Sequence, residues 1–160
     1  MAGTYARSTD VSSGRSRDEI ERTLERYGAD QFLYGWQEDA AVVGFRIGGR
    51  HIRLILPLPA KTERRFTHHS RGARAPDAAQ KEWEQAVRQK WRALALVIKA
   101  KLEAVESGIA VFEDEFMAYI VLPGGEETVG DFMRPQIAEA YRIGAAPNML
   151  PMLPAPNRPA

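Results

Sequence analysis

The pair Gly48-Gly49 constrains the fold more strongly than any other feature of this sequence. It separates two runs, residues 41–47 and 50–56, in which apolar side chains recur at every second position. This alternation is typical of β-strands, and two glycines between such runs favour a two-residue hairpin turn. The sequence therefore predicts an antiparallel hairpin whose register is set by the turn.

In this register Ile47 faces Arg50, and side chains at every second position share a face of the hairpin. One face carries the apolar residues Val43, Phe45, Ile47, Ile52, Leu54 and Leu56. The other face carries Arg46, His51 and Arg53 beside Gly44. The hairpin is thus expected to have a core face and a basic face.

Three aromatic residues alternate just before the hairpin and predict a first strand, which completes a three-stranded meander over residues 31–58. They are Phe32, Tyr34 and Trp36. A two-residue turn pairs Trp36 with Ala41 and places the aromatic side chains in the core. A shift of one residue places them on the basic face instead, where they would stack on bases.

Two segments have helical periodicity. Residues 16–27 begin with Ser16 and Glu19 at capping-box spacing. Residues 78–107 are expected to form a long helix with Asp77 as its N-cap. Its apolar stripe follows spacings of three and four residues: Trp83, Val87, Trp91, Leu94, Ile98, Leu102 and Val105.

The predicted class is α+β. Its elements are a short N-terminal helix, a three-stranded antiparallel meander, one long amphipathic helix, a fourth strand over residues 112–122 and a C-terminal helix over residues 128–141. Between the meander and the long helix, residues 60–77 form a long basic loop.

One domain is expected for 160 residues. Residues 1–15 are polar and predict a disordered arm, residues 16–143 form the single α+β domain, and residues 144–160 contain five prolines and predict a flexible tail. No apolar run approaches the roughly 20 residues that a membrane helix needs. The absence of cysteine and of a signal peptide favours a reducing, cytoplasmic setting.

The net charge of +1 conceals an uneven distribution. Residues 46–101 contain 14 basic and four acidic residues, whereas the remainder contains 8 basic and 17 acidic residues. A basic middle of this kind suggests a polyanionic partner. The alternative is that the acidic flanks fold over the middle and neutralise it within the domain.

Three segments resemble a family of uncharacterised proteins encoded by phages and prophages. They are RSRDEIERTLERYGADQF, KWRALALVIKAKLEAVESGI and FEDEFMAYIVLPGG, and the likeness covers most of residues 15–143. The resemblance implies the cytoplasm of a bacterial host, and it favours a role in DNA metabolism or in interference with a host system. It carries over no catalytic residue.

The leading prediction is a non-enzymatic nucleic-acid-binding accessory protein of a phage or prophage that favours single-stranded DNA. Cations on the strand face, the loop and one stripe of the long helix are the candidate phosphate contacts: Arg46, His51, Arg53, Arg64, Arg65, Arg71, Arg74, Lys81, Arg88, Arg92 and Lys99. The candidates for base stacking are Tyr34, Trp36 and Phe66.

Two other hypotheses come from different classes. In the first, the long helix forms a homodimer seam through Trp83 and Trp91, and the proline-rich tail docks on a host or phage protein. In the second, the acidic run Glu103, Glu106, Glu113, Asp114 and Glu115 binds Mg²⁺ in a nuclease. No specific catalytic or cofactor motif supports either one, so no catalytic residue, metal or cofactor is predicted.

Overall fold

The computed structural model describes residues 3–37 and 39–146 and confirms the α+β class. The principal elements are helix α1 (Gly3–Arg26), strands β1 (Gln31–Trp36), β2 (Ala40–Ile47) and β3 (Arg50–Pro57), and helices α3 (Pro76–Glu106) and α5 (Val129–Ile143). Shorter elements connect them: α2 (Arg64–Thr67), β4 (His68–His69), β5 (Gly72–Ala73), α4 (Phe112–Phe116) and the 3₁₀-helix η1 (Met117–Tyr119).

The predicted register of the sheet is confirmed. Ile47 pairs with Arg50, and Gly44 with Arg53, in an antiparallel sheet of order β1-β2-β3. Gly48 and Gly49 have φ angles of 55° and 74°, the left-handed backbone that a tight hairpin turn requires and that glycine adopts without steric cost. The core face and the basic face of the hairpin are therefore as expected.

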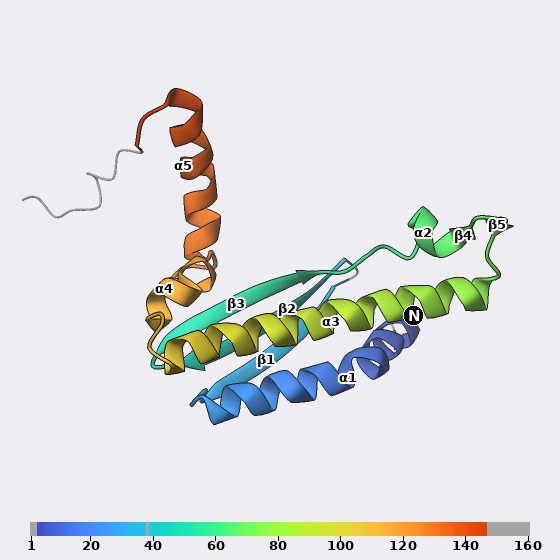
Figure 1. The fold of residues 1–160 in the computed structure, drawn as a ribbon, viewed down its shortest axis with the longest axis horizontal. Coiled ribbons are helices and arrows are strands. Elements are labelled where there is room, and N and C mark those ends of the chain that lie inside the picture. Colours follow the sequence, from blue (N-terminus) through green and yellow to red (C-terminus); the bar gives the residue numbers. More distant parts are fainter. Residues whose placement is uncertain (1–2, 38, 147–160) are drawn as a thin grey trace, which may run out of the picture.

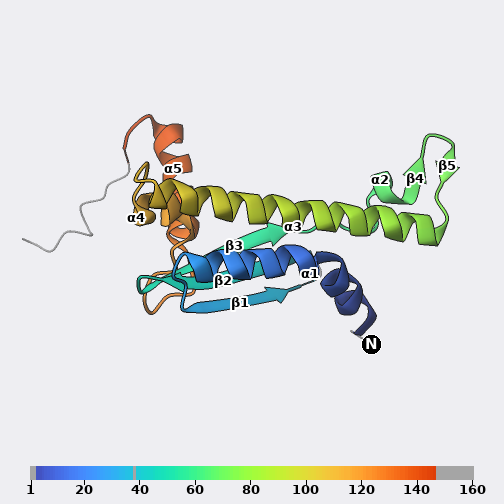
Figure 2. The ribbon, with the colours of Figure 1, turned by 60° about the horizontal axis from the view of Figure 1, so that its bottom comes forward.

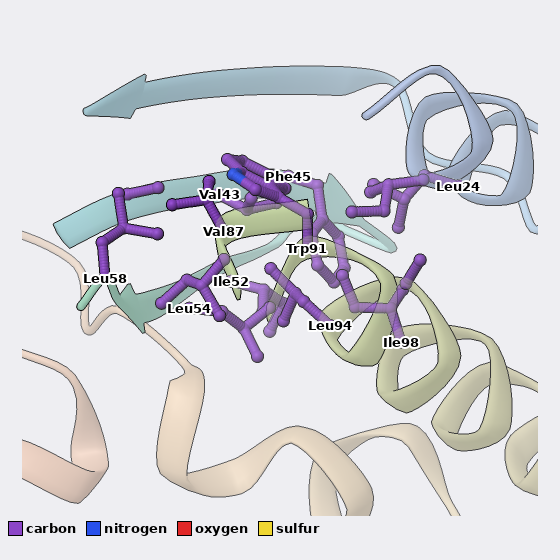
Figure 3. Close-up of a cluster of buried hydrophobic side chains, with 14 of the residues drawn as sticks. Leu24, Val43, Phe45, Ile52, Leu54, Leu58, Val87, Trp91, Leu94 and Ile98 are labelled. Carbon is purple, nitrogen blue, oxygen red and sulfur yellow. The ribbon is translucent and has the colours of Figure 1, made fainter. Parts of the chain in front are cut away.

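Helices α1 and α3 lie side by side on one face of the sheet (Figures 1 and 2). Figure 3 shows how the layers meet: Leu24 comes from α1, Phe45 and Ile52 from the sheet, and Trp91 and Ile98 from α3. All five side chains are buried. The core is thus a single layer between the two helices and the sheet.

Most side chains of the apolar stripe of α3 are buried in this core. Trp83 and Trp91 are 0% and 1% exposed, and the indole of Trp83 donates a 2.8 Å hydrogen bond to the carbonyl of Pro59. Both tryptophans pack inside their own chain, so neither side chain is exposed for the predicted homodimer seam.

The structure corrects three element boundaries. Helix α1 begins at Gly3 and not at Ser16, although residues up to 15 were expected to be disordered. The 60–77 segment is not a plain loop, because it contains α2 and the small β4–β5 hairpin. Helix α3 is capped at Ala75 with Pro76 in its first turn, a position where the missing N–H of proline costs nothing.

The predicted fourth strand is wrong. Most of residues 112–122 is helical, as α4 and η1, and only Ile120 and Val121 make isolated bridges, to Ile52 and Thr128. Phe112 and Phe116 stack at a centroid distance of 4.8 Å, an i, i+4 contact that a helix allows and an extended strand does not. The tail expected from residue 144 lies outside the described residues from 147 onward.

The predicted start of the last helix is confirmed. Thr128 and Asp131 form a reciprocal capping box at the start of α5. Figure 1 shows α5 extending away from the layered body, and among the described elements it packs chiefly on η1.

Candidate nucleic-acid interface

The arginines of the basic sheet face are paired with carboxylates. Arg46 donates two hydrogen bonds, of 2.8 and 2.7 Å, to Asp30, and Arg53 lies 3.5 Å from Asp131. The hydrogen bond from Arg46 holds the pKa of Asp30 below its usual value. His51 lies exposed beside them. The sheet face therefore has less free positive charge than its sequence suggested.

The acid flanks neutralise other cations of the middle segment in the same way. Arg50 lies 3.5 Å from Glu113, and Lys101 lies 3.0 Å from Glu115. In each pair, as in the two pairs of the sheet face, the acid comes from outside residues 46–101. Ion pairs within the chain thus neutralise three arginines of the sheet and Lys101 near the end of α3. None of the four pairs involves the exposed cationic stripe of α3, which consists of Lys81, Arg88, Arg92 and Lys99.

The cations of the 60–77 segment are divided between internal contacts and solvent. Arg65 lies 2.6 Å from Glu63, and Arg74 donates to the carbonyl oxygens of Arg65 and Phe66. Arg64 and Arg71 are exposed. This segment leaves two exposed arginines for a ligand.

The three aromatic candidates do not join the basic sheet face. Trp36 pairs with Ala41, which fixes β1 so that Tyr34 and Trp36 lie on the core side, where each is partly exposed. Tyr34 has the guanidinium of Arg17 over its ring at 4.1 Å. Phe66 is buried at 4% exposure and cannot stack on a base. The stacking platform expected for single strands is therefore not assembled on that face.

The exposed stripe of α3 faces a row of arginines on α1. Arg88, Arg92 and Lys99 line two neighbouring hollows of about 550 and 510 Å³ together with Arg15, Glu19, Arg22 and Arg26 from α1. Both rows follow from helix geometry, because residues seven and eleven apart return to the same side of a helix. We call this set of seven residues the α1/α3 groove.

The groove is a concentrated positive surface. Glu19 is its single acid, and none of its six cations forms an ion pair with another residue of the described chain. Lys81 is exposed and continues the α3 row, which spans about 27 Å from Lys81 to Lys99 at 1.5 Å per residue. The arrangement can hold an extended polyanion by charge.

The sequence predicted only one side of this groove. The α3 stripe was identified from its spacing, but Arg15, Arg22 and Arg26 were missed. Their seven- and four-residue spacing was a signal available in the sequence. What the spacing does not reveal is that α1 packs beside α3 with this row turned toward the stripe.

The acidic run does not converge on a point. Glu103 accepts a hydrogen bond from Tyr27, Glu113 lies near Arg50 and Glu115 near Lys101. Among the described residues, no three histidine, aspartate or glutamate side chains are grouped closely enough to hold a metal ion. The geometry thus gives the nuclease hypothesis no support.

Comparisons of the chain with family models, with curated proteins and with solved structures found no match. The resemblance to phage and prophage proteins therefore stays a prediction. Within residues 3–37 and 39–146, no helix has the combination of length and apolar character needed to cross a bilayer.

Proposed function

We propose that this protein binds the sugar–phosphate backbone of a nucleic acid along the α1/α3 groove, without catalysing a reaction. The observation that carries the proposal is the meeting of two cationic rows from helices far apart in the sequence, with one acid between them. A single charged stripe on α3 would be explained by its exposure to solvent alone, but two facing rows of cations are not. Two rows turned toward each other repel, so their proximity costs stability unless an anion occupies the groove.

The chemistry favours contacts to phosphate over contacts to bases. Arginine and lysine neutralise phosphates and release condensed counterions, which gives affinity without sequence preference. Sequence-tolerant binding of single strands also needs exposed aromatic side chains on the same surface, and the groove contains none. We therefore propose a binder of the sugar–phosphate backbone that has no preference for single-stranded DNA.

The test is a salt series of fluorescence anisotropy with labelled single- and double-stranded oligonucleotides. We expect saturable binding that weakens steeply with salt, with a log–log slope of about −0.9 per contact for duplex and −0.7 for single strands. The double variant Arg88→Gln with Arg92→Gln removes two contacts and should flatten the slope by roughly 1–2 units.

The matched control is the double variant Lys90→Gln with Arg50→Gln. Both of these side chains are exposed and lie outside the groove, and the change in net charge is the same. An equal loss in both double variants would show that only net charge matters. No saturable binding at about 50 mM salt would refute the proposal, because electrostatic affinity is strong at that concentration.

A further inference from the structure

Helix α5 has an apolar side that the described chain leaves uncovered. Met133, Ile137 and Ala140 recur at spacings of four and three, and Phe132 and Ile143 flank them. Phe132, Ile137 and Ile143 are 43%, 48% and 52% exposed. Asp131, Arg134 and Arg142 lie on the opposite side of the helix. An amphipathic helix of this kind is stable in water only when its apolar side is packed.

The first turn of α5 is fixed to the body of the protein. Gly130 packs so closely that a Cβ there would lie 2.6 Å from the carbonyl oxygen of Ala118. The capping box and the Arg53–Asp131 ion pair hold the same turn. The helix therefore leaves the body in a set direction, away from its own sheet (Figure 1), and cannot fold back without losing these contacts.

The sheet also has an apolar surface that the described chain leaves uncovered. Its face opposite α1 and α3 exposes Leu33 and Ile55 at 66% and 58%. Val42 lies between them, and Leu33, Val42 and Gly44 line a hollow of about 210 Å³. The two arginines of this face are already paired with Asp30 and Asp131, so an approaching apolar surface meets little free charge.

We infer that two copies of this chain associate by reciprocal docking, with the apolar side of each α5 on the open sheet face of the other. A two-fold axis satisfies both surfaces at once, because each copy supplies one helix and one sheet face. Helices packed on both faces of a sheet are a standard layered architecture.

The exposed apolar area is large enough for specific association. With about 200 Å² per large residue, the exposed fractions of Phe132, Ile137 and Ile143 amount to roughly 290 Å² on each copy. Leu33 and Ile55 add roughly 250 Å² on the same scale. Reciprocal docking of these side chains then buries about 1,100 Å² in total, which clears the roughly 1,000 Å² that a specific interface needs.

Sedimentation velocity and disulfide trapping on the full chain test the inference. The wild type should sediment as a dimer, and Ile137→Asp or Leu33→Asp should each yield a folded monomer, because both side chains are exposed within one copy. Circular dichroism checks the fold. The chain contains no cysteine, so introduced thiols report only the intended contact.

In the trapping experiment, Leu33→Cys is mixed with Ile137→Cys and oxidised. We expect a cross-linked heterodimer, and little cross-linking of either variant alone. The control mixes Leu33→Cys with Ala138→Cys, which lies on the opposite side of α5, and should trap several-fold less. A monomeric wild type up to its solubility limit would overturn the inference. So would efficient cross-linking of Ile137→Cys with itself, which indicates an α5–α5 pair, or equal trapping by the control.

Discussion

Two helical glycines differ in what a side chain would meet. At Gly130 an added Cβ lies 2.6 Å from a backbone oxygen, whereas at Gly14 the nearest atom is the flexible Arg17 guanidinium at 3.8 Å. Helix propensity alone favours alanine at both sites by roughly 0.5–1 kcal/mol. The environment of each site decides whether this gain is realised.

We therefore expect opposite signs for the two substitutions. Gly14→Ala should raise the free energy of unfolding by up to about 1 kcal/mol, while Gly130→Ala should lower it by about 1–3 kcal/mol because η1 or α5 has to shift. Urea denaturation measures both. A stabilised Gly130→Ala variant would show that α5 is not seated closely on η1.

Tyr27 joins the end of α1 to α3. Its hydroxyl donates a 2.7 Å hydrogen bond to Glu103, and this bond, partial burial and the nearby charges of Glu103 and Glu106 raise the pKa of Tyr27 to about 12. The folded state thus holds the phenol proton more tightly than the unfolded state, where the pKa is 10.0. The contribution to stability is complete below pH 10 and is lost as the pH rises toward 12.

An absorbance titration of the phenolates tests this pairing. One of the five tyrosines should ionise later than its ordinary pKa predicts, and this late ionisation should be missing in Tyr27→Phe. The variant should also lose less stability than the wild type between pH 10 and pH 12. Persistence of the late ionisation in Tyr27→Phe would assign it to another tyrosine.

At the scale of the element, α3 offers a matched pair of leucines two residues apart. Leu94 is 7% exposed and packs in the core, while Leu96 is 58% exposed. Leu94→Ala should lower the free energy of unfolding by about 2–5 kcal/mol, and Leu96→Ala should stay within about 0.5 kcal/mol. Thermal or urea unfolding measures both changes. Similar losses would mean that the two sides of α3 are covered alike.

The sequence predicted elements well where the local pattern determines the structure. The Gly48-Gly49 turn fixed the sheet register, and the spacing of Trp83 to Leu102 predicted the buried side of α3. It failed for residues 112–122, where Phe112 and Phe116 pack within the helical segment. A short apolar segment is compatible with either a helix or a strand, and its packing against the rest of the chain decides between the two.

Only the part of the candidate site that depends on a local pattern could be predicted from the sequence. Spacing on α3 located Arg88, Arg92 and Lys99, because a stripe is a property of one helix. The pairing of Arg46 with Asp30 and of Arg53 with Asp131 depends on tertiary contacts, and it removes the sheet face from the strongest candidates. The neighbouring row on α1 depends on tertiary contacts as well.

In the whole molecule, the α1/α3 groove and the proposed dimer contact lie on opposite sides of the sheet. The α1/α3 groove lies over the helical layer, and the proposed dimer contact uses the open sheet face and α5. A dimer would therefore present two cationic grooves outward, and a variant that separates the copies should leave each groove intact. Arg88→Gln with Arg92→Gln should therefore weaken binding without separating the copies, and Ile137→Asp or Leu33→Asp should separate the copies without removing a groove cation.

The long sequence separation between α1 and α3 has a consequence for synthesis. Tyr27 and Glu103, which meet in the folded protein, are 76 residues apart. A growing chain produces α1 and the complete meander before α3 exists, so Val43, Phe45 and Leu54 face water until the tryptophans of α3 have left the ribosome. A message truncated between β3 and α3 would thus yield a polypeptide whose apolar sheet face stays exposed to water, and we expect such a chain to aggregate and not to form a smaller domain.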